Sequence, residues 1–311
     1  MTAPERTRNA PPNMGQPPES PAHPAFAPFI AAGLGVACLS FMDALMKGAS
    51  LQTSVYTATL LRSLVGAALI APVWMATRSG WPTLPVMKLH LERGVISAFM
   101  AFSFFYALTK LPLAEAIALS FVAPLLALYL ARVLLGETIS SQAILASLLG
   151  LIGTLAIVGG KFGRGEFDDD ALYGLAALAF SALLYAYNFI VIRRQSQVAG
   201  PVEIATFHSG IGGLVLLVLA PFLWVSPPPD ALGQIAAAGV LTVAGAMAIA
   251  WAYARAEAQA LVPIEYSGFV WASLLGWVFF REPATWPTIA GAALIVGGCW
   301  LATRKQAAMP A

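Results

Sequence analysis

The sequence predicts an all-α polytopic membrane protein, with ten transmembrane helices in two inverted five-helix repeats. Three observations lead to this prediction. Of the 311 residues, 59% are hydrophobic and only 10% are charged, with a mean hydropathy of +0.77, which leaves too few charges to solvate a globule of this size. Apolar runs recur at lengths suited to crossing a bilayer. The first half of the chain is also echoed in the second.

Composition excludes several classes of protein. Residues 1–24 contain seven prolines and no apolar run, so we expect a disordered cytoplasmic tail and not a signal peptide. A net charge of +2 without a basic block gives no footprint for nucleic-acid binding. Cys38 and Cys299 lie inside apolar runs, and the three histidines are scattered, so no metal-ligand spacing occurs. We therefore expect no nucleic-acid partner, no metal and no cofactor.

The repeat is clearest in the stretch from Tyr106 to Glu137, which is echoed from Tyr253 to Glu282. Each copy reads as a helix end, a short polar turn and an apolar run that closes on a glutamate. The register pairs Glu137 with Glu282, Ser120 with Glu265, Ile144 with Ile289, Gly153 with Gly298, Arg62 with His208 and Gly66 with Gly212. One duplicated unit thus accounts for the chain.

Ten apolar segments follow from this register: 26–46, 55–76, 94–108, 113–135, 143–158, 172–192, 204–225, 231–253, 261–280 and 286–301. The third, fifth and tenth fall short of the ~18 apolar residues that usually mark a spanning helix. The repeat nevertheless predicts a helix at each of them. We divide the chain into a tail (1–24), a first repeat (25–160), a periplasmic linker (161–170), a second repeat (171–303) and a second tail (304–311).

The lysines and arginines near the helix ends predict the orientation. With a cytoplasmic N-terminus, eleven of them lie inside and five outside, as the positive-inside rule requires. Both termini are then cytoplasmic. Because each repeat holds five spans, the second is inserted upside down relative to the first, an architecture typical of transporters.

These residues resemble the drug/metabolite transporter superfamily in its two-repeat, ten-helix EamA form. The resemblance covers roughly 26–301 and rests on the LPLAEAIALSFVAPLLALYLARVLLGE stretch with Pro124, on Arg62 in the second span, and on a glycine-rich helix after each glutamate. The second copy departs from the pattern, because Phe269 stands in place of the proline and Glu265 and Tyr266 replace a neutral pair. Such proteins move amino acids, cofactors, sugar phosphates or amphiphilic toxins, so the resemblance implies transport without naming the cargo.

Four ionisable residues inside the predicted spans are candidates for binding or coupling: Asp43, Arg62, His208 and Glu265. Asp43 also has the spacing of a surface ion pair with Lys47. It is the most plausible partner for Arg62 from the neighbouring span, in a pair that either holds helices together or binds substrate. His208 could be a packing residue or a proton relay. Glu265 is the strongest candidate, because it shares its repeat position with Ser120 and can grip an amino group or carry a coupling proton. An interfacial carboxylate is the alternative reading of Glu265.

Aromatic and polar side chains could complete a cavity for a flat or amphiphilic solute. The candidates are Phe102, Tyr106, Trp251, Tyr266, Trp271 and Asn188, the last near the repeat position of Asp43. Many aromatics in such a protein only pack or lie at the membrane interface. The cavity is therefore an expectation from spacing and residue type.

The predicted function is a secondary transporter of the bacterial-type inner membrane, exporting small amino-acid-like or aromatic metabolites by alternating access. Its partners would be a small-molecule substrate, the lipid bilayer and protons as a candidate coupling ion. An importer of riboflavin or S-adenosylmethionine is the alternative. A pore lacks an obvious selectivity ring, and an intramembrane enzyme is disfavoured because no nucleophile has a base and an orienting partner. No ATP-binding motif occurs.

Overall fold

The computed structural model describes residues 26–78, 80–135, 141–163, 168–195, 197–253, 255, 261, 264 and 266–303. Within these ranges the chain is helical, with short turns and no strand. The expected polytopic all-α character is therefore observed across the described part of the chain. Glu265 and the turn after Leu135 lie outside it.

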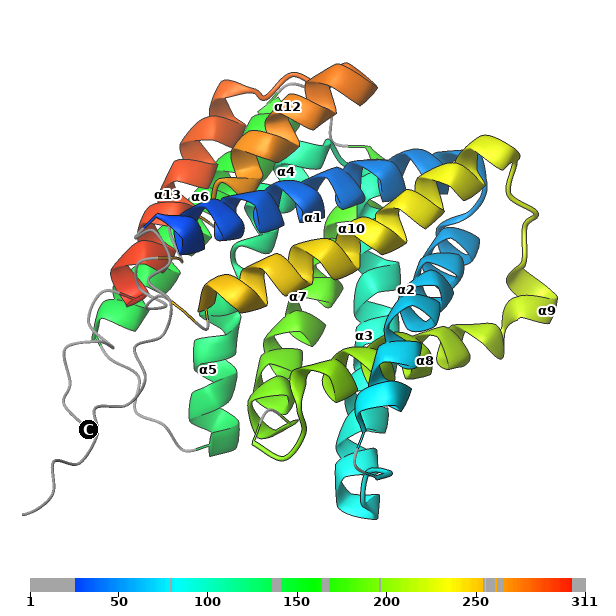
Figure 1. The fold of residues 1–311 in the computed structure, drawn as a ribbon. Helices are drawn as coiled ribbons and strands as arrows, with labels where there is room; N and C mark the ends of the chain where they lie inside the picture. The colour runs from blue at the N-terminus through cyan, green and yellow to red at the C-terminus, as the bar shows by residue number, and fades with distance from the viewer. Residues whose placement is uncertain are drawn as a thin grey trace, which may run out of the picture.

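The helices lie in one bundle (Figure 1). In chain order they are α1 (Ala27–Gln52), α2 (Val55–Thr77), α3 (Leu84–Lys110), α4 (Leu113–Ser120), α5 (Ala123–Leu135), α6 (Ser141–Gly163), α7 (Asp169–Gln195), α8 (Pro201–Leu217), α9 (Ala220–Leu223), α10 (Pro229–Tyr253), α12 (Gly268–Phe280) and α13 (Trp286–Thr303).

Five helices in the described ranges are long and apolar enough to cross a membrane: α1, α2, α3, α7 and α10. Five shorter apolar helices of 10–17 residues accompany them, at Leu113–Ala127, Leu148–Gly160, Pro201–Leu217, Gly268–Phe280 and Trp286–Gly298. The third span is longer than we expected from its apolar run, since α3 begins at Leu84 and not near Gly94. Its first turns carry polar side chains that α7 and α8 bind, as described below.

Two helices are interrupted at matching positions. The chain turns at Phe121 and Val122 between α4 and α5, and again at Tyr266 and Ser267 before α12, 145 positions later. At the first break Pro124 cannot donate to the carbonyl four residues back, which interrupts a helix. At the second break Phe269 stands at the position that corresponds to Pro124, and Gly268 supplies a residue of low helix propensity.

Long helices from distant parts of the chain lie side by side. α1 runs along α10, α3 along α7 and α6 along α13, while α2 crosses α8 (Figure 1). Glycines permit the closest approaches. A β-carbon on Gly153 of α6 would lie 2.5 Å from the carbonyl oxygen of Gly291 on α13, and one on Gly35 of α1 would lie 3.0 Å from that of Gly245 on α10. These crossings tie the two halves of the sequence together.

A buried ion pair fixes the turn between α3 and α4. Lys47 Nζ of α1 donates to Glu282 Oε1 at 2.5 Å and to the Leu111 carbonyl at 2.8 Å. The amide of Leu113, at the start of α4, donates to the other carboxylate oxygen of Glu282 at 2.8 Å. Lys47 thus pairs across the bundle with Glu282, the glutamate that ends the second copy of the echoed stretch.

Candidate functional site

A polar cavity lies where α2, α3, α8 and α10 meet. Its volume is about 40 Å³, and it is partly open to the outside. Its lining consists of Arg62, Ser63 and Gly66 from α2, Ser97, Ala98 and Ala101 from α3, His208, Ser209 and Gly212 from α8, and Thr242 and Val243 from α10. Both halves of the sequence therefore contribute to one cavity.

The lining residues occur in matching pairs from the two halves. The α2 sequence RSLVG from Arg62 lines the cavity opposite the α8 sequence HSGIG from His208. GVIS, ending in Ser97 of α3, corresponds in the same way to GVLT, ending in Thr242 of α10. The sequence register brought together Arg62 with His208 and Gly66 with Gly212, and the structure places all four at this cavity.

Close helix contacts beside the cavity repeat the same pairing. A β-carbon on Gly94 of α3 would lie 2.4 Å from Ile211 Cγ2 of α8, and one on Gly239 of α10 would lie 2.4 Å from Val65 Cγ1 of α2. Each glycine thus admits an aliphatic side chain from the other half of the sequence. These contacts hold α2 and α8 against their neighbours on either side of the cavity.

Three lining side chains carry buried polar atoms without a hydrogen-bond partner in the described structure. They are Arg62 Nε, Ser97 Oγ and His208 Nδ1. The described hydrogen bond of the guanidinium is a long one, from Nη1 to Thr242 Oγ1 at 3.5 Å. Because buried polar groups are normally satisfied, three such atoms at one cavity are a concentration of unmet hydrogen-bonding capacity that contacts within the described structure do not explain.

Charged groups surround this cavity. The guanidinium of Arg62 lies 5.2 Å from the ring centroid of Phe105 on α3, a cation–π distance. Asp43 of α1 acts electrostatically on Arg62 without forming an ion pair with it among the described contacts. The charge of Arg93 on α3 reaches His208, as does that of Arg62. Arg62 is therefore the charged residue of the described lining, and Arg93 on α3 and Asp43 on α1 are charged neighbours outside it.

A buried hydrogen-bond network lies next to the cavity and links α3, α7 and α8. His90 Nε2 contacts Glu203 Oε1 at 3.0 Å, and His90 Nδ1 contacts Gln195 Nε2 at 2.5 Å. Since an amide nitrogen only donates, Nδ1 is the acceptor and Nε2 carries the proton toward Glu203. Arg93 donates to Gln195 Oε1 at 3.1 Å and to Asn188 Oδ1 at 3.3 Å. Asn188, a predicted site residue, thus holds Arg93 and does not line the cavity.

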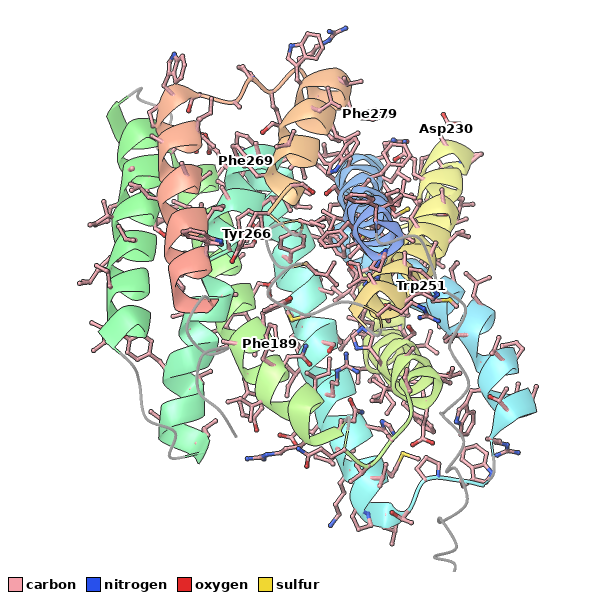
Figure 2. The ribbon with its side chains drawn as sticks, turned by 60° about the vertical axis from the view of Figure 1, so that its left-hand side comes forward. Phe189, Asp230, Trp251, Tyr266, Phe269 and Phe279 are labelled. Carbon is pink, nitrogen blue, oxygen red and sulfur yellow. The ribbon has the colours of Figure 1, made fainter. Side chains whose placement is uncertain are left out.

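The interrupted helices form a second feature. Tyr266 packs edge-on against Phe121, its counterpart at the first break, with ring centroids 5.3 Å apart. Ser120 Oγ donates to the carbonyl of Ala116 in its own helix at 2.8 Å. Figure 2 shows Tyr266 and Phe269 at the end of α12 where the break occurs, with Phe279 at the other end. Glu265, the strongest candidate from sequence, falls outside the described residues.

The other aromatic candidates are spread through the bundle. Phe102 packs with Tyr56, Ala98 and Leu216 beside the cavity. Tyr106 is half-buried in α3, nearer its end. Trp251 lies at the opposite end of α10 from Asp230 (Figure 2). The guanidinium carbon of Arg255 lies 4.2 Å from the centroid of the Trp251 ring. Trp271 is 38% exposed on the outer face of α12. The described structure does not gather these four into one cavity.

Several residues at or near the cavity were missed by sequence reasoning. Ser97, Ser209 and Thr242 lie in apolar runs, where a lone hydroxyl usually bonds its own helix. For Ser97 and Thr242, the correspondence between GVIS in the first half and GVLT in the second was a signal that could have identified them. His90 and Arg93 were missed because the predicted span began after them. No group of three or more metal-ligating side chains occurs within the described ranges.

The amino-acid sequence of this chain is similar to those of several proteins of known function. The chain is 28% identical over 276 residues to the pseudopaline exporter CntI of Pseudomonas aeruginosa, covering 86% of this chain and 92% of that protein. It is 27% identical over 209 residues to the S-adenosylmethionine uptake transporter of Rickettsia prowazekii, covering 67% and 69%. It is 28% identical over 216 residues to the aromatic amino acid exporter YddG of Ancylobacter novellus, covering 67% and 74%.

A solved crystal structure shares the fold, with a TM-score of 0.60 over 88% of this chain and 97% of the other at 23% identity. The sequence profile of the EamA-like transporter family matches twice, at residues 27–159 and 172–304. The named relatives and the family are transporters, as the resemblance implied. The chain belongs to the EamA-like transporter family.

Proposed function

We propose that this chain is a secondary transporter of the bacterial inner membrane that exports small amino-acid-like or aromatic metabolites. The observation that carries the proposal is the cavity between α2, α3, α8 and α10, where corresponding residues of the two halves face one another. Midplane sites at the interface of two repeats are typical of alternating-access transporters. Two relatives named as exporters support the direction of transport.

The ten-helix inverted architecture belongs to the same proposal, with repeats at 25–160 and 171–303 and both termini cytoplasmic. Packing supports it, because α1 lies along α10 while α7 lies along α3, and α12 contacts α1 while α5 contacts α7. Exchanging the two halves by a shift of about 145 residues turns the contact between α1 and α10 into the contact between α7 and α3. The same exchange turns the contact between α12 and α1 into the contact between α5 and α7. Matching breaks at Phe121 and Tyr266 agree with the discontinuous helices of such transporters.

Counterflow in proteoliposomes tests the function. Vesicles with purified protein are loaded with an unlabelled panel of amino acids, purines, riboflavin and S-adenosylmethionine, and uptake of each labelled solute is followed. We expect saturable exchange of aromatic or branched amino acids. Exchange of S-adenosylmethionine or riboflavin alone would favour an importer. Flux that does not saturate would indicate a pore, and chemical alteration of a solute would indicate an enzyme.

A pair of variants on α8 ties transport to the cavity. Gly212→Leu places a side chain into the cavity that Gly212 lines, where a β-carbon meets only ordinary contacts. Gly210→Leu makes the same substitution two residues away, where a β-carbon meets nothing within 4 Å. We expect exchange to fall at least about tenfold in the first, because a filled site excludes substrate, and to stay near wild type in the second. Equal rates in the two variants would remove the cavity from the pathway.

A further inference from the structure

From the cavity geometry we infer that Arg62, Ser97 and His208 bind a carboxylate group of the transported solute. This inference rests on the transporter function proposed above and names the class of its substrate. It assigns a specific role to atoms that are otherwise unexplained in the fold.

The first argument is hydrogen bonding. Arg62 Nε and Ser97 Oγ can both donate, and His208 Nδ1 can donate in one tautomer; all three lack partners in the described structure. Ser97 is only 4% exposed, so open solvent does not satisfy it. A carboxylate supplies several lone pairs from two oxygens. It can therefore accept from Arg62 and from Ser97 or His208 at once.

The second argument is charge. Two guanidiniums act at His208, those of Arg62 and Arg93. The described hydrogen bonds of Arg93 go to the neutral amides of Asn188 and Gln195, and the carboxylate of Glu203 lies further along the same network, beyond His90. Asp43 offsets one of the two charges from α1. The carboxylate of a solute that enters beside Arg62 is attracted by its guanidinium.

The third argument is shape. The Arg62 guanidinium packs against Phe105, and its Nε is buried without a hydrogen-bond partner in the described structure. A planar guanidinium matches a carboxylate better than a point charge does. Ala98, Ala101 and Val243 form the apolar part of the lining. This leaves an apolar surface for the carbon skeleton of the solute beside the anion site.

Matched solute pairs test the inference by binding, independently of transport. Thermal stabilisation of the detergent-solubilised protein is measured with tryptophan and tryptamine, phenylalanine and phenethylamine, and leucine and isoamylamine. We expect the acids to stabilise the wild-type protein at concentrations at least about tenfold below the amines, since hydrogen bonds to a charged group are worth about one to two decades in affinity. Equal effects of acids and amines, as a water-filled cavity would give, or no stabilisation by any acid, would overturn it.

Variants assign the discrimination to the named side chains. Arg62→Gln and Ser97→Ala should each reduce the preference for the acid, while Arg62→Lys should keep the preference and weaken affinity, because the charge remains but the planar donors are lost. Arg78→Gln, at the other end of α2, and Ser103→Ala, elsewhere on α3, are the matched controls. Each variant must first show wild-type melting without solute. An unchanged preference in correctly folded Arg62→Gln and Ser97→Ala would refute the assignment.

Counterflow of the same pairs separates this inference from the transporter function. Exchange of amines and acids alike would leave a transporter whose carboxylate site is wrong. Acid-selective binding without any exchange would leave the carboxylate site and remove the transport function. The two proposals therefore fail in different assays.

Discussion

Replacing Glu282, which fixes the α3–α4 turn, should lower the unfolding free energy more than replacing any exposed charged residue. At an effective dielectric constant near 20, unit charges 2.5 Å apart attract by roughly 6–7 kcal/mol. Desolvation of the two groups offsets much of this, because the Lys47 side chain is 4% exposed and that of Glu282 22%. Loss of one partner from such a pair costs about 3–5 kcal/mol, and the Leu113 amide also loses its acceptor.

Equilibrium unfolding in detergent mixtures, followed by the fluorescence of the eight tryptophans, measures these effects. We expect Glu282→Ala to lower the unfolding free energy by about 3–5 kcal/mol and Lys47→Met by less, since Glu282 is the more exposed partner. The double variant should lose about 2 kcal/mol less than the sum of the single variants, a coupling typical of contacting groups.

The exposed pair of Lys110 and Asp170, 2.8 Å apart with side chains 27% and 59% exposed, is the matched control. Lys110→Met should leave the unfolding free energy close to that of the wild type, because an exposed ion pair contributes little. Additive losses in the Lys47 and Glu282 double variant, or a control as costly as Glu282→Ala, would refute the reasoning that burial makes this ion pair structural.

Three further changes test other parts of the molecule. Glu265→Gln should reduce transport more than Asp43→Asn at matched expression, and wild-type rates in the first variant would exclude Glu265 from the site. His90→Phe keeps a ring but deletes two buried hydrogen bonds, so unfolding should become about 1–3 kcal/mol easier; no change would mean that its partners re-pair. Gly153→Leu forces a side chain against a backbone carbonyl of α13 and should destabilise by about 1–3 kcal/mol or more, whereas Gly297→Leu, with open space around it, should not.

The helical membrane character was predictable because composition and apolar run length report it directly. The cavity was predictable in part, because Arg62 and His208 are ionisable residues within apolar runs and the repeat register pairs them. An intramembrane charge stands out against its surroundings. That contrast led to two of the residues that line the cavity.

Other features were hidden from the sequence for physical reasons. A serine such as Ser97 satisfies itself in most helices, so its unpaired state depends on packing by a distant helix. The interaction of Lys47 with Glu282 crosses most of the chain, and the nearer Asp43 offered a simpler local partner at helical spacing. The polar start of α3 was excluded because apolar content alone does not reveal that α7 and α8 provide partners for His90.

Divergence between the two halves gives the cavity its chemistry. Both halves have a glycine at the same repeat position, Gly94 and Gly239, and each admits an aliphatic side chain from the other half. The side chains differ, with Arg62 facing His208 across the cavity. Two arginines there would place a second full charge in the site and suit a dianion, and two histidines would supply no permanent charge. One guanidinium and one imidazole, together with the Ser97 hydroxyl of the same lining, are the combination on which the proposed site for a single carboxylate rests.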